Sequence, residues 1–316
     1  MLFRSVAPAG AGFVSWGGDG AVRFWDTDGG AFDGGWPTSN GSDLIGVTLA
    51  GPGFVSWDEN GAVRFWDAEG RVLPDRGHPK AHAGDVWGVL QAGSGFVSWG
   101  GDGGVWFWDA EGRVLPDRGH PKAHTGDVWG VLQAGSGFVS WGGDGGVWFW
   151  DAEGRVLPDR GHIRAHNGSV RGLLPIGFGL ISWGGDGAVR VWDVEGELSP
   201  DRGHPKAHDG GVVGVAPAGC GFVSWGRDGA IWFWDAEGER LPDRGHPKAH
   251  DGDVRGVLQA GSGFVSWDEN GEVRFWDEEG RVLPDRGHLK AHDGDVRGVL
   301  QAGSGFVSWG GGSGVW

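Results

Sequence analysis

Apolar and polar residues alternate along much of the chain in short runs, which are separated by glycine-rich turns. Within residues 104–109, Val105 and Phe107 alternate with Trp106 and Trp108, which is the period of two expected of a strand. The preceding Gly-Gly-Asp-Gly at 100–103 is a tight-hairpin signal, and no segment has helical periodicity. Residues 82–123 therefore predict four strands, at 85–91, 96–99, 104–109 and about 113–115. Pro116 is expected to end the pairing of the fourth strand, and 117–123 to form a loop.

The same four-strand pattern recurs along the whole chain. A Ser-Trp pair marks the second strand of each copy, with a spacing of 41 residues once and 42 residues six times. Nine residues later, seven of the copies carry a Trp-Asp pair. We number these tandem repeats one to eight by the tryptophan of the Ser-Trp pair: Trp16, Trp57, Trp99, Trp141, Trp183, Trp225, Trp267 and Trp309.

The repeat resembles the WD40 repeat in three features: Ala-His near its start, Ser before a Gly/Asp-rich hairpin, and Trp-Asp at the end of the third strand. The period fits the ~40–45 residues of that family, although a Trp directly after the Ser is unusual for it. The resemblance covers nearly the whole chain and implies an all-β, WD40-like β-propeller. Residues 1–316 would form a single domain of eight four-stranded antiparallel blades, the last one incomplete.

How such a ring would close is open from the sequence. Seven blades with an overhanging partial blade is the alternative to eight. Because the chain begins at a first strand, no terminal strand is expected to complete the last blade. A monomer and a strand-sharing dimer are therefore both expected states.

Composition narrows the classes of partner. The net charge is −16 at pH 7, and a general nucleic-acid binder needs a basic surface. No apolar stretch approaches the ~20 residues of a membrane span, and residues 1–12 lack a signal-peptide pattern. The single cysteine, Cys220, has no disulfide partner in the chain. We therefore expect a cytoplasmic protein with neither a nucleic-acid nor a membrane partner.

Each full repeat contains Ser, His and Asp, the residue types of a hydrolase triad. The WD40 resemblance implies a structural tetrad instead, in which hydrogen bonds link Trp through Ser and His to the hairpin Asp. Such a network pairs polar groups that are buried between packed sheets, and the chain lacks a nucleophile-elbow motif. No catalytic residue is expected. The predicted tetrads are His82, Ser98, Asp102 and Trp108; His124, Ser140, Asp144 and Trp150; His166, Ser182, Asp186 and Trp192; and His208, Ser224, Asp228 and Trp234.

Some repeats depart from the tetrad pattern. Asn60 and Asn270 replace the hairpin Asp of repeats two and seven, Asn40 replaces the His of repeat two, and Gly312 replaces the Asp of repeat eight. Because an amide both accepts and donates hydrogen bonds, Asn270 is expected to preserve a weakened network. The end repeats are expected to be the least stable.

The twelve histidines fall in two registers four residues apart. His-x-x-x-His can chelate a transition metal, but one His of each pair is expected in a tetrad, and no third ligand accompanies it. The Gly/Asp-rich hairpins resemble fragments of calcium loops without their full spacing. We therefore expect no metal and no cofactor. The histidines outside the tetrad register are His78, His120, His162, His204, His246 and His288.

Two strand positions hold chemically different residues in repeats that are otherwise nearly identical. They hold Arg4, Ile45, Trp87, Trp129, Arg171, Val213, Arg255 and Arg297 in the first strand, and Arg23, Arg64, Trp106, Trp148, Arg190, Trp232, Arg274 and Trp316 in the third. A core position cannot exchange Trp for Arg without a large desolvation cost, so these side chains are predicted to reach solvent. They form either a solvated face of cross-paired Arg and Trp or a recognition surface. The candidate binding surface comprises Trp87, Trp106, Trp129, Trp148, Arg171, Arg190, Trp232, Arg255, Arg274 and Arg297.

These features predict a non-catalytic binding scaffold that presents a ring face to a protein or peptide, as the sensor part of a larger protein. Near-identity of the copies indicates recent repeat amplification. One alternative is a multivalent lectin-like glycan binder, in which Trp side chains stack on sugar rings and equivalent sites give avidity. Another is a repeat propeller that was built or selected without an evolved ligand.

Overall fold

The computed structural model describes residues 3–9, 12–17, 19–30, 42–68, 70–162, 164–177, 179–288 and 290–311. All regular elements in these residues are strands, and none of these residues belongs to a helix that could cross a membrane. The chain separates into two compact halves, Met1–Ile163 and Arg164–Trp316. We call them the N-terminal and C-terminal halves and describe each by itself. The interpretation as a single domain stays a prediction.

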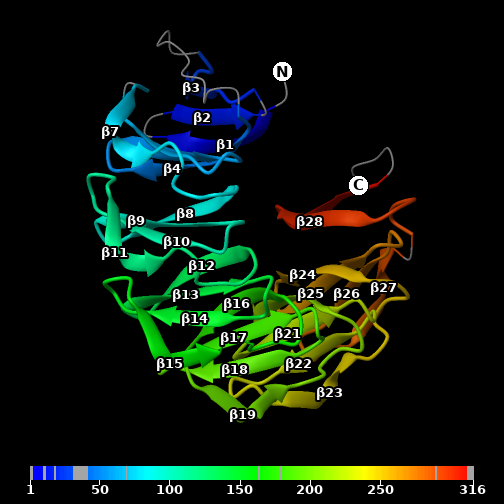
Figure 1. Cartoon of the computed structure of the whole chain (residues 1–316). Coiled ribbons are helices and arrows are strands. Elements are labelled where there is room, and N and C mark those ends of the chain that lie inside the picture. The colour runs from blue at the N-terminus through cyan, green and yellow to red at the C-terminus, as the bar shows by residue number, and fades with distance from the viewer. Residues whose placement is uncertain are drawn as a thin grey trace. The chain divides into compact units, whose positions relative to one another are not determined.

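The N-terminal half contains repeats one to four as successive antiparallel sheets (Figure 1). Each sheet follows chain order, and three of the four have four strands, whereas the sheet of repeat one has three in the described residues. The strands are β1 (Phe3–Ala9), β2 (Gly12–Gly17) and β3 (Val22–Asp26); β4 (Leu44–Ala50), β5 (Gly53–Asp58), β6 (Val63–Trp66) and β7 (Val72–His78); β8 (Val86–Ala92), β9 (Gly95–Gly100), β10 (Val105–Trp108) and β11 (Val114–His120); and β12 (Val128–Ala134), β13 (Gly137–Gly142), β14 (Val147–Trp150) and β15 (Val156–His162).

The C-terminal half repeats the same order in three four-stranded sheets and, for repeat eight, two strands in the described residues. Its strands are β16 (Val170–Ile176), β17 (Gly179–Gly184), β18 (Val189–Asp193) and β19 (Leu198–His204); β20 (Val212–Ala218), β21 (Gly221–Gly226), β22 (Ile231–Trp234) and β23 (Arg240–His246); β24 (Val254–Ala260), β25 (Gly263–Asp268), β26 (Val273–Trp276) and β27 (Val282–His288); and β28 (Val296–Ala302) and β29 (Gly305–Gly310).

The fourth strand is longer than the sequence predicts, and that prediction was wrong. In repeat three, β11 continues past Pro116 to His120, where it pairs again with Val105 of β10. Pro116 falls where the register shifts, between the Trp108↔Val114 and Trp106↔Gly119 pairs. Because β11 is also the edge strand of its sheet, the missing N–H of the proline removes no ladder hydrogen bond.

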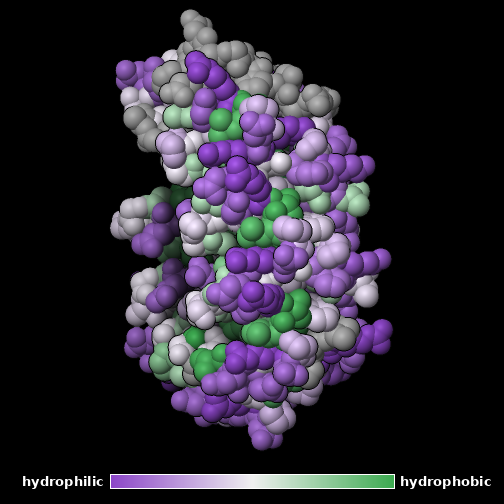
Figure 2. Space-filling view, turned by 60° about the vertical axis from the view of Figure 1, so that its left-hand side comes forward, coloured by the Kyte–Doolittle hydropathy of each residue, from purple (hydrophilic) through white to green (hydrophobic). Residues whose placement is uncertain are grey.

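The hydrophobic core lies between consecutive sheets. Val105 and Phe107 of β10 pack against the next repeat, where they meet Val128, Phe138 and Trp150. The opposite face of the same sheet, with Trp108, packs against the preceding repeat. Within a half, a sheet that lies between two others is therefore buried on both faces. On the face that Figure 2 shows, apolar residues appear as separate green patches among hydrophilic ones.

Backbone hydrogen bonds connect several consecutive repeats within each half. The N–H of His124 donates to the carbonyl of Gly103 at 3.1 Å, and the N–H of Gly119 donates to the carbonyl of Gly154 at 2.7 Å. Gly103 has a φ of +78°, and a Cβ at this position would lie 2.3 Å from the carbonyl oxygen of His124. Only glycine fits both the turn and this approach.

Candidate functional site

The structure brings each predicted tetrad together as one hydrogen-bonded chain. In repeat three, Nδ1 of His82 lies 2.9 Å from Oδ1 of Asp102, and Nε2 lies 2.9 Å from Oγ of Ser98. The indole N–H of Trp108 donates to the same Oγ at 3.0 Å. The contacts recur within 0.1 Å in the other three: His124, Asp144, Ser140 and Trp150; His166, Asp186, Ser182 and Trp192; and His208, Asp228, Ser224 and Trp234.

One arrangement of hydrogen atoms satisfies every polar group in this chain. The Trp108 N–H donates to Ser98, the Ser98 hydroxyl donates to Nε2 of His82, and Nδ1–H donates to Asp102. We assign this tautomer from the hydrogen-bond network. His82, Ser98 and Trp108 are all buried, so the hydroxyl is engaged twice and screened from solvent by the packed sheets.

The hairpin aspartates are the acceptors at the end of each chain. Burial alone would raise the pKa of Asp144, but hydrogen bonds from His124 and from the N–H groups of Gly146 and Thr125 outweigh it and lower the pKa to about 2. In the next tetrad, burial lowers the pKa of His166, and this effect outweighs the hydrogen bond to Asp186, which raises it. That imidazole is therefore held neutral at pH 7.

The hairpins of repeats two and seven, which lack the tetrad Asp, differ from what the sequence predicts. Asn270 does not replace the tetrad Asp: only its backbone N–H contributes, donating to Oδ1 of Asp268 at 3.0 Å. The expectation that this amide takes the place of the aspartate was therefore wrong: the groups that face Nδ1 of His250 are the carboxylates of Asp268 and Glu272. Repeat two has the same shift, with Asp58 buried beside Ser42 and Arg64. Asn40 and Gly312 lie outside the described residues.

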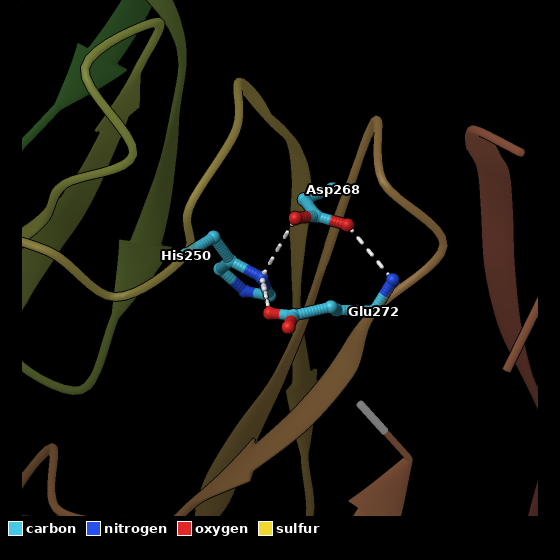
Figure 3. Close-up of side chains that lie close together, drawn as sticks. All are labelled: His250, Asp268 and Glu272. Atoms are coloured by element: carbon cyan, nitrogen blue, oxygen red, sulfur yellow. Dashed lines mark hydrogen bonds and ion pairs between the residues drawn. The ribbon is translucent and has the colours of Figure 1, made fainter. Parts of the chain in front are cut away.

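Repeat seven gathers a cluster that no other described repeat has. His250, Asp268 and Glu272 each offer one ligand atom, and these atoms lie within 4.8 Å of one another (Figure 3). Nδ1 of His250 is 3.5 Å from Oδ2 of Asp268 and 3.4 Å from Oε2 of Glu272. The signal was present in the sequence as Asp-Glu-Asn-Gly-Glu at 268–272, but the sequence analysis interpreted Asp-Glu-Asn-Gly as a turn that only resembles a fragment of a calcium loop.

A second recurrent feature, the Trp after the strand-two Ser, has a partner that sequence reasoning missed. In repeat three the ring of Trp99 lies over Gly88 of β8, where a Cβ would come within 2.2 Å of Cζ2 of the indole. The first strand therefore carries glycine because a ring from the second strand occupies the space of a side chain. The glycines are Gly46, Gly88, Gly130, Gly172, Gly214, Gly256 and Gly298.

The two variable strand positions lie in different environments. In the first strand, Trp87 and Trp129 are each 38% exposed, and they occupy equivalent positions on the neighbouring strands β8 and β12. Arg255 and Arg297 are exposed at the same position of repeats seven and eight. Arg171 is partly covered: its Nη1 donates to the carbonyl of Val212 at 3.0 Å, and burial lowers the pKa of its guanidinium.

The third-strand position lies over the tetrads. The ring of Trp106 stands edge-on to His82 at 6.5 Å between centroids, and its indole N–H is buried without a hydrogen-bond partner in the described residues. Arg190 is instead 3.3 Å from Asp186, and Arg274 contacts Glu272 at 2.9 Å. Trp106, Trp148, Arg190, Trp232 and Arg274 are half-buried. They therefore reach solvent less than the substitution pattern predicts, and four of the five lie against buried polar groups: Trp106, Trp148, Arg190 and Arg274.

The histidines of the other register lie at strand ends. Nδ1 of His78 accepts the backbone N–H of Lys80 at 3.1 Å, and His120, His204 and His246 make the equivalent contact. These rings are exposed, whereas the tetrad histidines are buried. The side chains of His162 and His288 lie outside the described residues.

No protein-family model matches the sequence, and a search of curated proteins found no match. Among solved structures, the chain is similar to the crystal structure of the computationally designed Ika8 protein, with a TM-score of 0.66 and 23% identity. The alignment covers 97% of this chain and 92% of that one. At this identity the likeness shows the fold alone: tandem, propeller-like repeats of four-stranded antiparallel sheet.

Proposed function

We propose that the chain is a WD40-like β-propeller of eight repeats that acts as a non-catalytic scaffold and binds a peptide segment of a protein partner. Two observations support a non-catalytic role. The tetrad serines are buried, and each hydroxyl is engaged in two hydrogen bonds. The residues that resemble a triad also recur around the chain as polar links within packed sheets.

The exposed pair of Trp87 and Trp129 carries the proposal. Two large rings at equivalent positions on adjacent strands present apolar area to solvent, which is costly unless a partner covers it. The hairpin beside Trp87 has glycine at 101, where a Cβ would lie 3.6 Å from the indole nitrogen. No side chain from this hairpin position covers the ring, so an apolar side chain of a bound peptide can pack against it.

The test replaces both rings by the residue that other repeats carry. Repeats five, seven and eight have Arg at this position, so the fold is expected to accept Trp87→Arg with Trp129→Arg. Random peptides displayed on phage would be selected on the full chain, and their affinities for both proteins measured by calorimetry. The double variant is expected to bind selected peptides at least about tenfold more weakly, or about 1.4 kcal/mol.

The matched control is Val194→Arg, which also replaces an exposed apolar side chain by Arg. It is expected to leave peptide affinity unchanged. Enriched peptides that bind the double variant and the wild type equally would contradict the proposal, as would a selection that enriches none.

The same two rings favour one alternative, a glycan site, because indole faces at repeated positions can stack on sugar rings. A glycan array distinguishes the glycan site from the peptide site. Saturable sugar binding that disappears in the double variant, with no peptide enriched, would support the lectin-like function instead.

A further inference from the structure

The hairpin of repeat seven differs from those of repeats three and four at three positions that act on one histidine. Asp268 stands where repeat three has Gly100, Asn270 where it has Asp102, and Glu272 where it has Gly104. In repeat three, Nδ1 of the tetrad His has a hydrogen bond of 2.9 Å. In repeat seven, Nδ1 of His250 faces two carboxylates at 3.4 and 3.5 Å instead.

These contacts are too long to be good hydrogen bonds. His250 is 1% exposed and Asp268 is 0% exposed, yet Nδ1 of His250 and Oδ2 of Asp268 have no hydrogen-bond partner in the described residues. A single N–H cannot point at both carboxylates, and unpaired buried polar atoms are costly. Two unpartnered atoms, Nδ1 of His250 and Oδ2 of Asp268, are thus buried and face each other beside the carboxylate of Glu272, as Figure 3 shows.

The distances of 3.4 and 3.5 Å from Nδ1 of His250 to the two carboxylates fit a metal ion better than a shared proton. Around a tetrahedral ion with bonds of about 2.0–2.1 Å, neighbouring ligand atoms are about 3.3–3.4 Å apart. We propose that Nδ1 of His250, Oδ2 of Asp268 and the carboxylate of Glu272 bind a divalent transition-metal ion of the Zn²⁺ class. Three protein ligands leave the fourth position to water. The proposal is independent of the peptide site proposed above.

The surrounding contacts hold the ligands as a metal site requires. Nε2 of His250 is 2.7 Å from Oγ of Ser266, so Nε2–H donates there when Nδ1 binds the ion. Oδ1 of Asp268 accepts the N–H groups of Asn270 at 3.0 Å and Glu272 at 2.8 Å, which leaves Oδ2 free to face His250. Arg274 orients the carboxylate of Glu272 at 2.9 Å and offsets one of the two negative charges.

Repeat two provides an internal comparison. It has the same substituted hairpin, with Asp58 and Asn60, but Ala62 stands in place of Glu272 and Asn40 in place of His250. Arg64 pairs with its buried carboxylate. The set of three ligand types is therefore complete in repeat seven only, and one ion per chain is expected.

The experiment titrates the full chain with Zn²⁺ alone, following binding by calorimetry and the melting temperature with and without EDTA. One saturable Zn²⁺ per chain and a higher melting temperature that EDTA reverses are expected. Glu272→Ala places in repeat seven the residue that repeats two, five and six already carry, so it should fold. It is expected to weaken Zn²⁺ binding at least about tenfold, and His250→Asn is expected to abolish it.

The control is His246→Asn, which removes an exposed histidine four residues earlier and should leave Zn²⁺ binding unchanged. Full-length protein that binds no Zn²⁺ saturably would overturn the proposal. So would one-to-one binding that persists unchanged in Glu272→Ala and in Asp268→Asn, or that is lost in His246→Asn, since the ion would then sit on a surface histidine.

Discussion

At the scale of single residues, the hairpin aspartate is the acceptor on which each tetrad ends. The carboxylate of Asp144 accepts three hydrogen bonds of 2.9 Å, from Nδ1–H of His124 and from the backbone N–H groups of Thr125 and Gly146. Three donors from two segments thus converge on one side chain. Its removal leaves all three unpaired while their surroundings remain packed.

Replacing this residue should therefore be costly. Asp144→Ala is expected to lower the free energy of unfolding by about 1–3 kcal/mol, since the donors it leaves behind include a buried imidazole N–H. Urea unfolding followed by circular dichroism measures this change. The control is Asp159→Ala, an exposed aspartate of the same repeat, which should change the free energy by less than about 0.5 kcal/mol. Equal stabilities of the two variants would contradict the role assigned to Asp144.

The resemblance to the WD40 repeat implied these tetrads residue by residue, because the residues that carry it recur at the same spacing in four repeats. It did not predict how repeat seven replaces its aspartate. Which group faces an imidazole depends on where side chains lie in space, and Asp268 approaches His250 from a hairpin position that is glycine in repeats three and four. Comparison by position therefore drew attention to Asn270 rather than to Asp268.

At the scale of strands, the pairing of Trp and Gly determines how the first two strands of a repeat fit. The ring of Trp141 lies over Gly130, where a Cβ would come within 2.2 Å of Cζ2. The backbone of β12 therefore approaches the indole as closely as packing allows. Any side chain at position 130 has to displace the ring.

Gly130→Ala is accordingly expected to destabilise the protein by about 1–3 kcal/mol through overpacking. Thermal unfolding measures the effect, and Gly177→Ala serves as the control, because a Cβ there meets nothing within 4 Å. If both variants melt at the wild-type temperature, the indole is free to move aside and the close approach is not a constraint.

Strand positions were well predicted from the alternating pattern, and fourth-strand length was not. Alternation identifies strands whose two faces contact different neighbours, as in β10. The edge strand β11 has mostly half-exposed or exposed residues, so no alternation marks its end, and Pro116 suggested an earlier stop. Its continuation depends on backbone contacts with the next repeat, such as that from Gly119 to Gly154, which leave no signature in side-chain polarity.

At the scale of the whole molecule, the repeated carboxylates make stability depend on pH. Although burial alone would raise the pKa of each hairpin carboxyl, hydrogen bonds, chiefly from histidine, lower it below its value in the unfolded chain. The unfolded state therefore binds more protons as the pH falls, and the folded state loses stability in acid. The pKa of His166, lowered by burial, acts in the same direction below about pH 6.5. The carboxyls are those of Asp102, Asp144, Asp186 and Asp228.

The free energy of unfolding is thus expected to be greatest above about pH 6.5, to decline slightly towards pH 5 and to fall steeply below about pH 4. Urea titrations between pH 3 and pH 8 would measure this. They should be made in high salt, because protonation also relieves the repulsion of a chain with a net charge of −16, an opposite effect that salt screens. Stability that rises on acidification in high salt would contradict the assignment.

The number of repeats that a closed ring would need is the property that local sequence specifies least. Every repeat presents nearly the same apolar residues to its neighbours, so each interface looks alike whatever the total. Closure depends on small rotations between sheets, accumulated over the chain, and no single residue encodes their sum.

The backbone links between repeats have a consequence for how such a gene can change length. His124 donates to Gly103 and Gly119 donates to Gly154, and the corresponding residues of repeat two are Gly61 and Gly77. If residues 82–123 were deleted, repeat four would meet repeat two with the same donors facing the same acceptors. Loss or duplication of such a 42-residue segment thus leaves the new junction with the same donors and acceptors as the old one, so recombination between copies can vary the number of repeats while these backbone links are kept.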